Sequence, residues 1–277
     1  MRLLMKNKIL LSEKCNSIAV VPDGKLYFES IGKGEPLILI HAGLSDRRDW
    51  KYQIEDFRKE FNTIVYDQRG AGYSSVPINA FSPTEDLRAL MDHLKIAKAI
   101  LVGHSIGGTI ALDFALQYPD RVSALVLIAS GLNGYSWSNE YLEWFKAIWI
   151  APNSEEMTKQ ALSAPFYVIG MSKPDIKSEI ETITKESIQK ILTWKSLDVC
   201  CFFSDPVYKL KELKIPTFVV YGNNDSQDIK QIAQILSKNL PHVKIAQMQN
   251  ADHFLNFEKP NELNSLVLDF LSECAFK

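Results

Sequence analysis

Residues 103–108, with the sequence Gly-His-Ser-Ile-Gly-Gly, decide the fold. They follow the short apolar run Ala99–Val102 and lead into the helical pattern Ile106–Tyr118, which stops at Pro119. Where a strand turns sharply into a helix, the middle residue of G-x-S-x-G lies on a strained turn, and small neighbours avoid collisions with the backbone. The pattern therefore predicts that the Ser105 hydroxyl is exposed at the edge of a sheet, in front of the positive end of a helix dipole.

Short apolar runs of the same kind recur and predict further buried strands. Runs that are apolar on both faces are typical of a parallel sheet covered by helices. Helical patterns alternate with them, as at Pro83–Leu94, where Ser82 and Glu85 form a capping-box pattern. This alternation predicts an α/β fold with a mostly parallel, twisted sheet flanked by helices. The apolar runs are Leu37–Ile40, Thr63–Tyr66, Ala99–Val102, Ala124–Ile128 and Thr217–Tyr221.

The N-terminal part of the chain predicts a β-hairpin. Two strand-like runs, Ser17–Val21 and Lys25–Ser30, are separated by three turn-forming residues. Pro22 presets its own φ and Gly24 accepts a positive φ, so this segment favours a tight turn.

The alternation of strands and helices stops between residues 131 and 205. This stretch is helix-like and rich in aromatic residues. We interpret it as a helical cap inserted into a core formed by residues 1–130 and 206–277, lying over the carboxyl edge of the sheet as a lid rather than an independent domain. Most of its aromatic side chains should pack the cap, and a few should line an apolar acyl or alcohol pocket. The candidate substrate-binding residues are Leu44, Trp137, Trp144 and Phe166.

The composition indicates an ordinary soluble protein. The chain has 31 Lys and Arg against 33 Asp and Glu, with no basic stripe, which argues against a nucleic-acid partner. The longest apolar run, Ala124–Ala129, is far shorter than the roughly 20 residues of a membrane-spanning helix. Charged residues interrupt the N-terminal apolar stretches, so we expect no signal peptide. The four cysteines lack a Cys-x-x-Cys motif, which favours reduced, mostly buried thiols in a cytoplasmic protein. The shortness of the apolar runs predicts no membrane partner.

A reactive serine hydroxyl needs a general base, and that base needs an acid to orient it. Of the five histidines, His253 is favoured as the base because it lies in a loop between the strand-like run Val243–Ala246 and a terminal helix. His104 lies next to the serine, where its side chain should point away. His93 lies on a helical pattern, and His242 lies in an exposed-looking turn.

Asp225 is the favoured acid. It follows the carboxyl end of the strand-like run Thr217–Tyr221, from where it can reach the loop of His253. The side chain of Asp252 should diverge from its neighbour His253. Asp228 is the alternative acid, but it should begin the next helix, where a carboxylate suits the dipole.

The chain order Ser105, Asp225, His253 resembles that of the α/β-hydrolases. Together with further motifs, it identifies the sequence as a member of that superfamily, similar to its capped serine hydrolases of esterase or lactonase type. The resemblance spans roughly residues 37–131 and 215–271. The further motifs are His41-Ala42-Gly43-Leu44, residues 67–74 (Asp-Gln-Arg-Gly-Ala-Gly-Tyr-Ser), Gly222–Asp225, Asp252-His253-Phe254 and Glu258-Lys259-Pro260.

The resemblance implies an oxyanion hole made of two backbone N–H groups. These belong to Gly43, with Leu44 as the alternative register, and to Ile106, which follows the nucleophile. His41 takes a structural role in the same loop, and Ala42 stands where the family usually has glycine. Dehalogenases and epoxide hydrolases of this fold have Asp at the position of the nucleophile, so the serine here argues against both.

No cofactor and no metal are expected. Gly70-Ala71-Gly72 follows a strand, but Val76-Pro77 comes soon after it and no helix begins there to receive a pyrophosphate. Metal-ligand spacings such as H-E-x-x-H do not occur in the sequence.

These expectations describe a cofactor-independent serine hydrolase that cleaves a small carboxylic ester, lactone or related acyl substrate. A carbon–carbon bond hydrolase or lyase with the same triad is one alternative. A slow-turnover, ligand-binding, receptor-like protein on the same fold is another, since one fold hosts many functions. The expected partner is the small acyl substrate, and the sequence favours neither a monomer nor a homo-oligomer.

Overall fold

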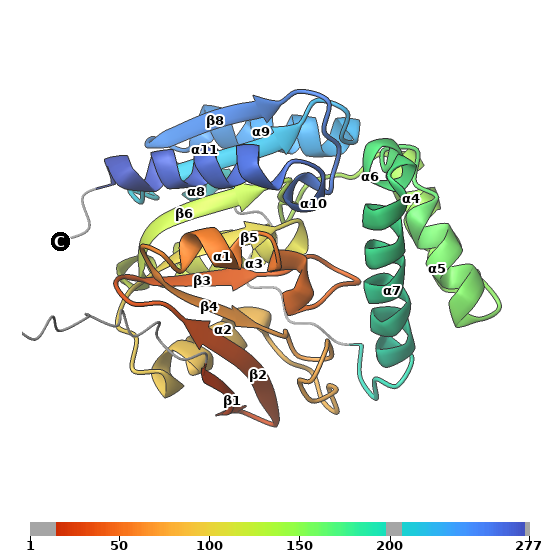
Figure 1. Ribbon diagram of the computed structural model, residues 1–277, viewed down its shortest axis with the longest axis horizontal. Coiled ribbons are helices and arrows are strands. Elements are labelled where there is room, and N and C mark those ends of the chain that lie inside the picture. Colours follow the sequence, from red (N-terminus) through yellow and green to blue (C-terminus); the bar gives the residue numbers. More distant parts are fainter. Residues whose placement is uncertain (1–14, 198–206, 275–277) are drawn as a thin grey trace, which may run out of the picture.

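The computed structural model describes residues 15–197 and 207–274, which build an eight-stranded sheet with the strand order β1-β2-β4-β3-β5-β6-β7-β8 (Figure 1). β1 pairs antiparallel with β2, and β2 with β4, whereas all later neighbours are parallel. The predicted α/β fold with a mostly parallel sheet is confirmed. The strands are β1 (Cys15–Val21), β2 (Gly24–Ile31), β3 (Pro36–Ile40), β4 (Asn62–Tyr66), β5 (Ala99–His104), β6 (Val122–Ile128), β7 (Thr217–Gly222) and β8 (Val243–Met248).

Helices cover both faces of the sheet. α1 (Ile54–Phe57) and α11 (Pro260–Glu273) contact each other on one face, and α2 (Pro83–His93) and α3 (Ile106–Gln117) contact each other on the other (Figure 1). α9 (Gln227–Asn239) packs against β7 and β8. Short helical segments complete the layers: η1 (Arg47–Trp50), η2 (Pro119–Arg121), α8 (Val207–Leu210) and α10 (Leu255–Glu258).

Two local predictions have different outcomes. The helix start at Ser82 is confirmed, because the Ser82 hydroxyl accepts a hydrogen bond from the Glu85 amide at 3.2 Å. The hairpin of β1 and β2 is present, but the positive φ expected at Gly24 is wrong, since Asp23 adopts it instead, with φ of 55°. Asp tolerates this conformation, and Gly24 serves another purpose. A Cβ on Gly24 would lie only 2.5 Å from Arg69 Nη1.

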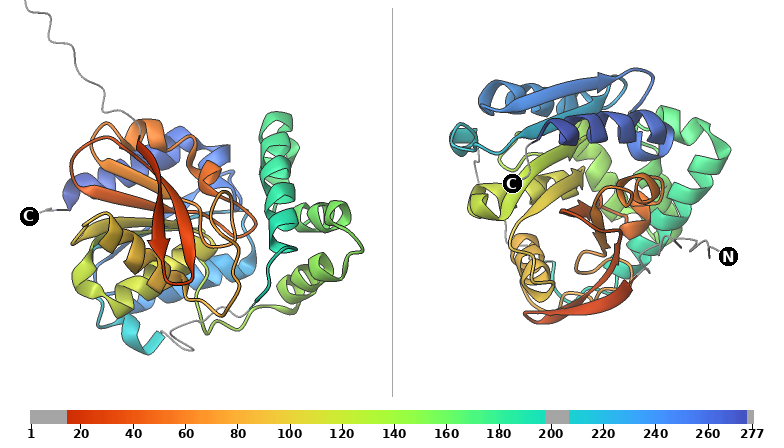
Figure 2. Two further views of the ribbon diagram at one scale, coloured as in Figure 1. Left: turned by 90° about the horizontal axis from the view of Figure 1, so that it is seen from below. Right: turned by 60° about the vertical axis from the view of Figure 1, so that its left-hand side comes forward.

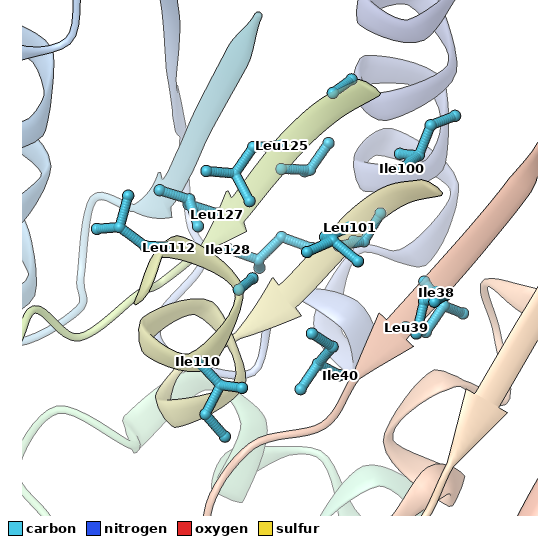
Figure 3. Close-up of a cluster of buried hydrophobic side chains, with 14 of the residues drawn as sticks. Ile38, Leu39, Ile40, Ile100, Leu101, Ile110, Leu112, Leu125, Leu127 and Ile128 are labelled. Carbon is cyan, nitrogen blue, oxygen red and sulfur yellow. The ribbon is translucent and has the colours of Figure 1, made fainter. Parts of the chain in front are cut away.

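The core covers both faces of the central strands, and Figure 3 shows part of it, where side chains of β3, β5 and β6 lie beside α3. Strands β3, β5 and β6 are buried on both faces, which is why their sequences are continuously apolar rather than alternating. Each large side chain buried in this way contributes about 1.5–3 kcal/mol to folding. This packing makes the carboxyl ends of the three strands a rigid platform. The side chains labelled in Figure 3 are Ile38, Leu39, Ile40, Ile100, Leu101, Ile110, Leu112, Leu125, Leu127 and Ile128.

Four helices of the described chain lie between β6 and residue 197: α4 (Asn139–Ile150), α5 (Ser154–Leu162), α6 (Val168–Ser172) and α7 (Pro174–Ile191). Figures 1 and 2 show them beyond the carboxyl ends of β3 and β6, beside the sheet layers. Ile180 and Ile183 of α7 pack with Phe257 of α10, which fastens this group to the core. The cap boundaries at residues 131 and 205 stay a prediction, because residues 198–206 lie outside the described part.

None of the described helices combines the length and the apolar character that a membrane crossing needs. Cys274 is a free thiol and partly buried. The side chain of Cys15 and both Cys200 and Cys201 lie outside the described part, so the expectation for these three thiols stays a prediction.

Candidate active site

Ser105 joins β5 to α3 in a strained conformation. Its φ of 54° and ψ of −118° lie outside the regions that non-glycine residues favour, at a cost of about 1–3 kcal/mol. The turn is held on both sides, since the Ser105 amide donates to Ile128 O at 2.9 Å and the Ser105 carbonyl accepts from Gly108 N at 3.0 Å. A Cβ on Gly103 or Gly107 would collide with backbone atoms. The strand–turn–helix geometry expected around Ser105 is present.

His253 and Asp225 meet at the same edge of the sheet. Asp225 follows β7 and His253 follows β8, and both are almost completely buried. The ring nitrogen Nδ1 of His253 lies 3.0 Å from Asp225 Oδ2. An ionised carboxylate can only accept, so Nδ1 carries the proton and Nε2 is left as the basic nitrogen. A second hydrogen bond, from Ser226 N to Asp225 Oδ1 at 2.6 Å, fixes the carboxylate.

Ser105 and His253 line the same cavity, but no hydrogen bond joins the serine hydroxyl to the imidazole. Catalytic hydrogen bonds are often long or misaligned without substrate and tighten when it binds. Among the described residues, Nε2 of His253 has no other partner, so it is free to take a proton from Ser105.

The other two carboxylates considered as acids face elsewhere. Asp228, in the first turn of α9, accepts hydrogen bonds from the Ser138 hydroxyl at 2.6 Å and the Ser138 amide at 3.0 Å. Asp252 accepts from the Ile169 amide at 2.6 Å. Both therefore fasten the segment between β6 and β7 to the core, and neither forms a hydrogen bond with His253.

The pH dependence of kcat/KM should report the ionisation of His253. Burial alone lowers the pKa of this imidazole, but the charge and the hydrogen bond of Asp225 outweigh burial and raise the pKa above its ordinary value of 6.5. The base must be neutral, so kcat/KM should rise with pH through a single ionisation centred above 6.5. Initial rates at low substrate concentration from pH 5 to 9 measure this. A flat profile, or one centred well below 6.5, would contradict the assignment.

The loop after β3 supplies the candidate oxyanion donors. The Ala42 amide is already used, since it donates to Asp49 Oδ2 at 3.0 Å. In the described chain, the amides of Gly43 and Ile106 donate to no other group, and a Cβ on Gly43 would lie 3.6 Å from Ile106 Cγ2. Leu44 has a φ of 51°, so the loop turns away directly after Gly43. This geometry keeps Gly43 and Ile106 as the candidate pair.

His41 links two loops of the candidate site through hydrogen bonds, in line with the structural role expected for it. Its Nδ1 lies 2.7 Å from Ala42 O, and its Nε2 accepts from Gln68 N at 3.0 Å. The ring therefore links the loop after β3 to the loop after β4.

A buried network that the sequence did not reveal joins the three loops of the candidate site. Nδ1 of His104 lies 2.9 Å from Asp49 Oδ2, and Nε2 lies 2.9 Å from the backbone oxygen of His253. The two ring nitrogens of His104 therefore bridge the Asp49 carboxylate and the backbone of the loop that carries His253. Asn256, just after His253, donates to Asp49 Oδ1 at 3.1 Å. Asp49 thus connects the loop of Ala42, the serine turn and the base loop.

Asp49→Ala should lower the free energy of unfolding by about 3–5 kcal/mol, because the buried groups His104 Nδ1, Ala42 N and Asn256 Nδ2 lose their partner, each at a cost of about 1–3 kcal/mol. Chemical denaturation followed by circular dichroism measures the change. Glu186→Ala is the control, since it removes a partner of Arg48 from an ion pair whose side chains are 37% and 55% exposed. That change should cost less than about 1 kcal/mol. Equal losses in the two variants would show that the Asp49 network does not stabilise the fold.

A cavity of about 500 Å³ opens above Ser105 and is lined by both the core and the helices α4, α5 and α7. Leu44 and Trp144 line it, as predicted. Trp137 and Phe166 are not among the described residues of its wall. Trp137 packs against the main core and stacks on Tyr141, with ring centroids 4.1 Å apart, and Phe166 is buried behind Trp144.

The sequence analysis missed Tyr167, which lines the cavity with its ring centroid 5.5 Å from that of His253. Phe145 and Trp149, on α4, also line the cavity and are 45% and 38% exposed, so they lie near its opening. The aromatic-rich sequence of α4 indicates that some of its side chains line a pocket. It does not indicate which side of the helix faces the cavity.

Two observations bear on metal and dinucleotide binding. No group of three or more His, Cys, Asp or Glu side chains that could hold a metal occurs among the described residues. Gly70 lies in a turn, where its amide donates to Ser75 O at 2.9 Å. The next helix begins only at Pro83, so no helix N-terminus follows this turn directly.

Comparisons with known proteins show which family and fold this chain shares. A family model described as alpha/beta hydrolase fold matches residues 35–260. The 2-hydroxy-6-oxononadienedioate/2-hydroxy-6-oxononatrienedioate hydrolase of Burkholderia vietnamiensis is 27% identical over 291 residues, covering 96% of this chain and 99% of the relative. The enol-lactonase of Burkholderia xenovorans has a TM-score of 0.79 at 22% identity, covering 93% of this chain and all of that chain. The naproxen esterase of Bacillus subtilis has a TM-score of 0.77 at 17% identity, covering 94% and 92%. At these identities the two structures demonstrate a shared fold.

Proposed function

The chain belongs to the alpha/beta hydrolase fold family, and from this premise we propose that it is a cofactor-independent serine hydrolase. Its substrate is a small carboxylic ester, lactone or related acyl compound. The observation that carries the proposal is that Ser105, on its strained turn, and His253, which is paired with Asp225, line one largely apolar cavity. A volume of about 500 Å³ suits a small organic molecule.

Acylation begins with attack of Ser105 Oγ on the substrate carbonyl, while Nε2 of His253 takes the hydroxyl proton. The negative charge that develops on the carbonyl oxygen is stabilised by the amides of Gly43 and Ile106. Each such donor typically accelerates the reaction by a factor of about 10² to 10³. The intermediate collapses to an acyl-enzyme, and His253 returns the proton to the leaving alcohol.

Deacylation repeats these steps with water. His253 takes a proton from the water molecule, which attacks the acyl carbon, and the carboxylic acid leaves as Ser105 recovers its proton. Asp225 stays ionised throughout. It holds Nδ1 of His253 protonated and stabilises the imidazolium that forms in each half-reaction.

Hydrolysis of a carbon–carbon bond is the second candidate. The relative from Burkholderia vietnamiensis is named a hydrolase of a 2-hydroxy-6-oxo dienedioate, and it covers nearly the whole of this chain. The same base and oxyanion donors could act on a carbonyl next to a carbon leaving group.

A substrate panel separates the candidates. It contains p-nitrophenyl esters with acyl chains of increasing length, aliphatic lactones, and a 2-hydroxy-6-oxo dienoate, each assayed with the wild-type chain and with Ser105→Ala. The proposal expects the highest kcat/KM with an ester or a lactone, dependent on Ser105. Turnover of the dienoate alone would favour carbon–carbon cleavage, and no turnover of any member would favour a ligand-binding protein.

A further inference from the structure

The cavity continues past Ser105 along one face of α3. The α3 residues in its wall are Ile106, Thr109, Ile110 and Asp113. These positions follow the i, i+3, i+4, i+7 pattern, so they share a side of the helix. Asp113 lies eight residues beyond Ser105, which at 1.5 Å per residue places the two backbones about 12 Å apart. The cavity therefore has a second end, distant from the reacting atoms.

Asp113 is an unusual side chain for this wall. It is 3% exposed, and one of its oxygens, Oδ2, accepts a hydrogen bond from Asn133 Nδ2. The other oxygen, Oδ1, is buried with no hydrogen-bond partner. Burial raises the pKa of Asp113 to about 7, although the Asn133 bond acts in the opposite direction. A buried acceptor without a partner is costly, and native structures keep few of them.

The other carboxylates of the same cavity wall are each paired with a basic side chain. Asp49 is paired with His104 at 2.9 Å, and Asp86 is paired with Arg69 at 2.8 Å. Among the described residues, Asp113 has no cationic partner. The negative charge that it carries when ionised is thus not compensated by the protein. The apolar residues Ile106 and Ile110 line the same side of the cavity between Asp113 and the reacting serine.

We propose that Asp113 and Asn133 form a subsite for a primary ammonium group, carried by the substrate at the end remote from the bond that is cleaved. This inference deepens the proposed hydrolase function and rests on it. An ammonium supplies a charge of the missing sign and three N–H donors. Because Nδ2 of Asn133 bonds to Asp113, its amide oxygen is left as a second acceptor. The methylene chain of such a substrate would contact Ile106 and Ile110.

The length of the cavity sets the probe. An extended chain advances roughly 1.2 Å per bond, so the eight bonds from the acyl carbon to the nitrogen of 8-aminooctanoate span about 10 Å. A hydrogen bond adds about 2.9 Å to that reach. The substrates are the p-nitrophenyl esters of 8-aminooctanoic acid, octanoic acid and suberic acid, which end in an ammonium, a methyl and a carboxylate group. At pH 8 the Asp113 carboxyl, with its pKa of about 7, is mostly ionised.

The measured quantity is the ratio of kcat/KM for the amino ester to kcat/KM for the octanoate. A charge-assisted hydrogen bond predicts a ratio of about 10 to 100 in the wild-type chain, with the suberate as the poorest substrate. Asp113→Asn should lower the ratio about tenfold or more. Asn133→Ala changes a partly exposed position and should lower the ratio as well. This second variant keeps the test valid if Asp113→Asn does not fold. Asp120→Asn removes an exposed carboxylate outside the cavity and should keep the wild-type ratio.

The outcomes separate the two proposals. Ser105-dependent turnover of the octanoate supports the hydrolase proposal. If the ratio of kcat/KM values is then near 1 in the wild-type chain, the ammonium subsite is refuted. It is also refuted if the ratio is the same in the wild type, Asp113→Asn and Asn133→Ala. A preference for the suberate would also refute it. If none of the three esters is turned over and the panel above is silent too, the hydrolase proposal itself fails.

Discussion

Ser105→Ala is expected to lower kcat for p-nitrophenyl acetate by about 10⁶-fold, down to the level that binding and the oxyanion donors alone can support. The loss is this large because the hydroxyl is the atom that forms the covalent bond, and no other side chain lies on the strained turn between β5 and α3. Active-site burst kinetics and steady-state rates measure it. The melting temperature should stay close to that of the wild type, since the Ser105 hydroxyl makes no hydrogen bond with the described residues.

Ser163→Ala is the matched control. This serine is exposed and lies between α5 and α6, and within the described chain its hydroxyl bonds only to Gln160 O. Its loss should leave kcat within about twofold. Residual activity of Ser105→Ala above a hundredth of the wild-type rate, from protein free of wild-type contamination, would remove Ser105 from the mechanism.

Asp225→Asn is expected to lower kcat by about 10⁴-fold. The side-chain amide introduced at position 225 would donate a hydrogen bond to Nδ1 of His253, so it favours the tautomer with its hydrogen on Nε2, which cannot act as the base. The neutral amide also no longer stabilises the imidazolium. The charge and hydrogen bond of Asp225 raise the pKa of His253 against the effect of burial. With that charge removed, burial is less opposed, so the inflection of kcat/KM should move to lower pH than in the wild type.

Asp228→Asn tests whether the effect belongs to this one carboxylate. Asp228 lies three residues further on and binds Ser138 rather than His253. Its replacement should reduce kcat far less and leave the inflection where it is. A larger loss in Asp228→Asn than in Asp225→Asn would reverse the assignment of the acid.

The sequence predicted the fold well where a local pattern has one structural solution. Continuous apolar runs gave the central strands, and the turn at Ser105 followed from its glycines, because larger residues there collide with backbone. The positions of Asp225 and His253 followed from topology, since the carboxyl ends of β7 and β8 lie at the edge where β5 also ends.

Other features could not be predicted because they depend on packing between distant segments. The pairing of Asp49 with His104 joins residues far apart in the chain, and neither position has a local signal. Which aromatic residues face the cavity depends on the rotation of each helix, so Trp144 lines it while Trp137 packs on the core. Asp113 is a charged residue in a buried and mostly apolar helix, but only its lack of a partner for Oδ1 distinguishes it from a satisfied carboxylate.

Covalent labelling by a fluorophosphonate tests most directly whether Ser105, His253 and Asp225 act together. The probe reacts with a serine only when a neighbouring base activates it, and intact-mass and peptide analysis locate the adduct. We predict one adduct per chain, on the peptide that contains Ser105, formed much more slowly in His253→Ala and absent in Ser105→Ala. A wild-type chain that remains unlabelled, or one labelled at another serine, would contradict the catalytic triad.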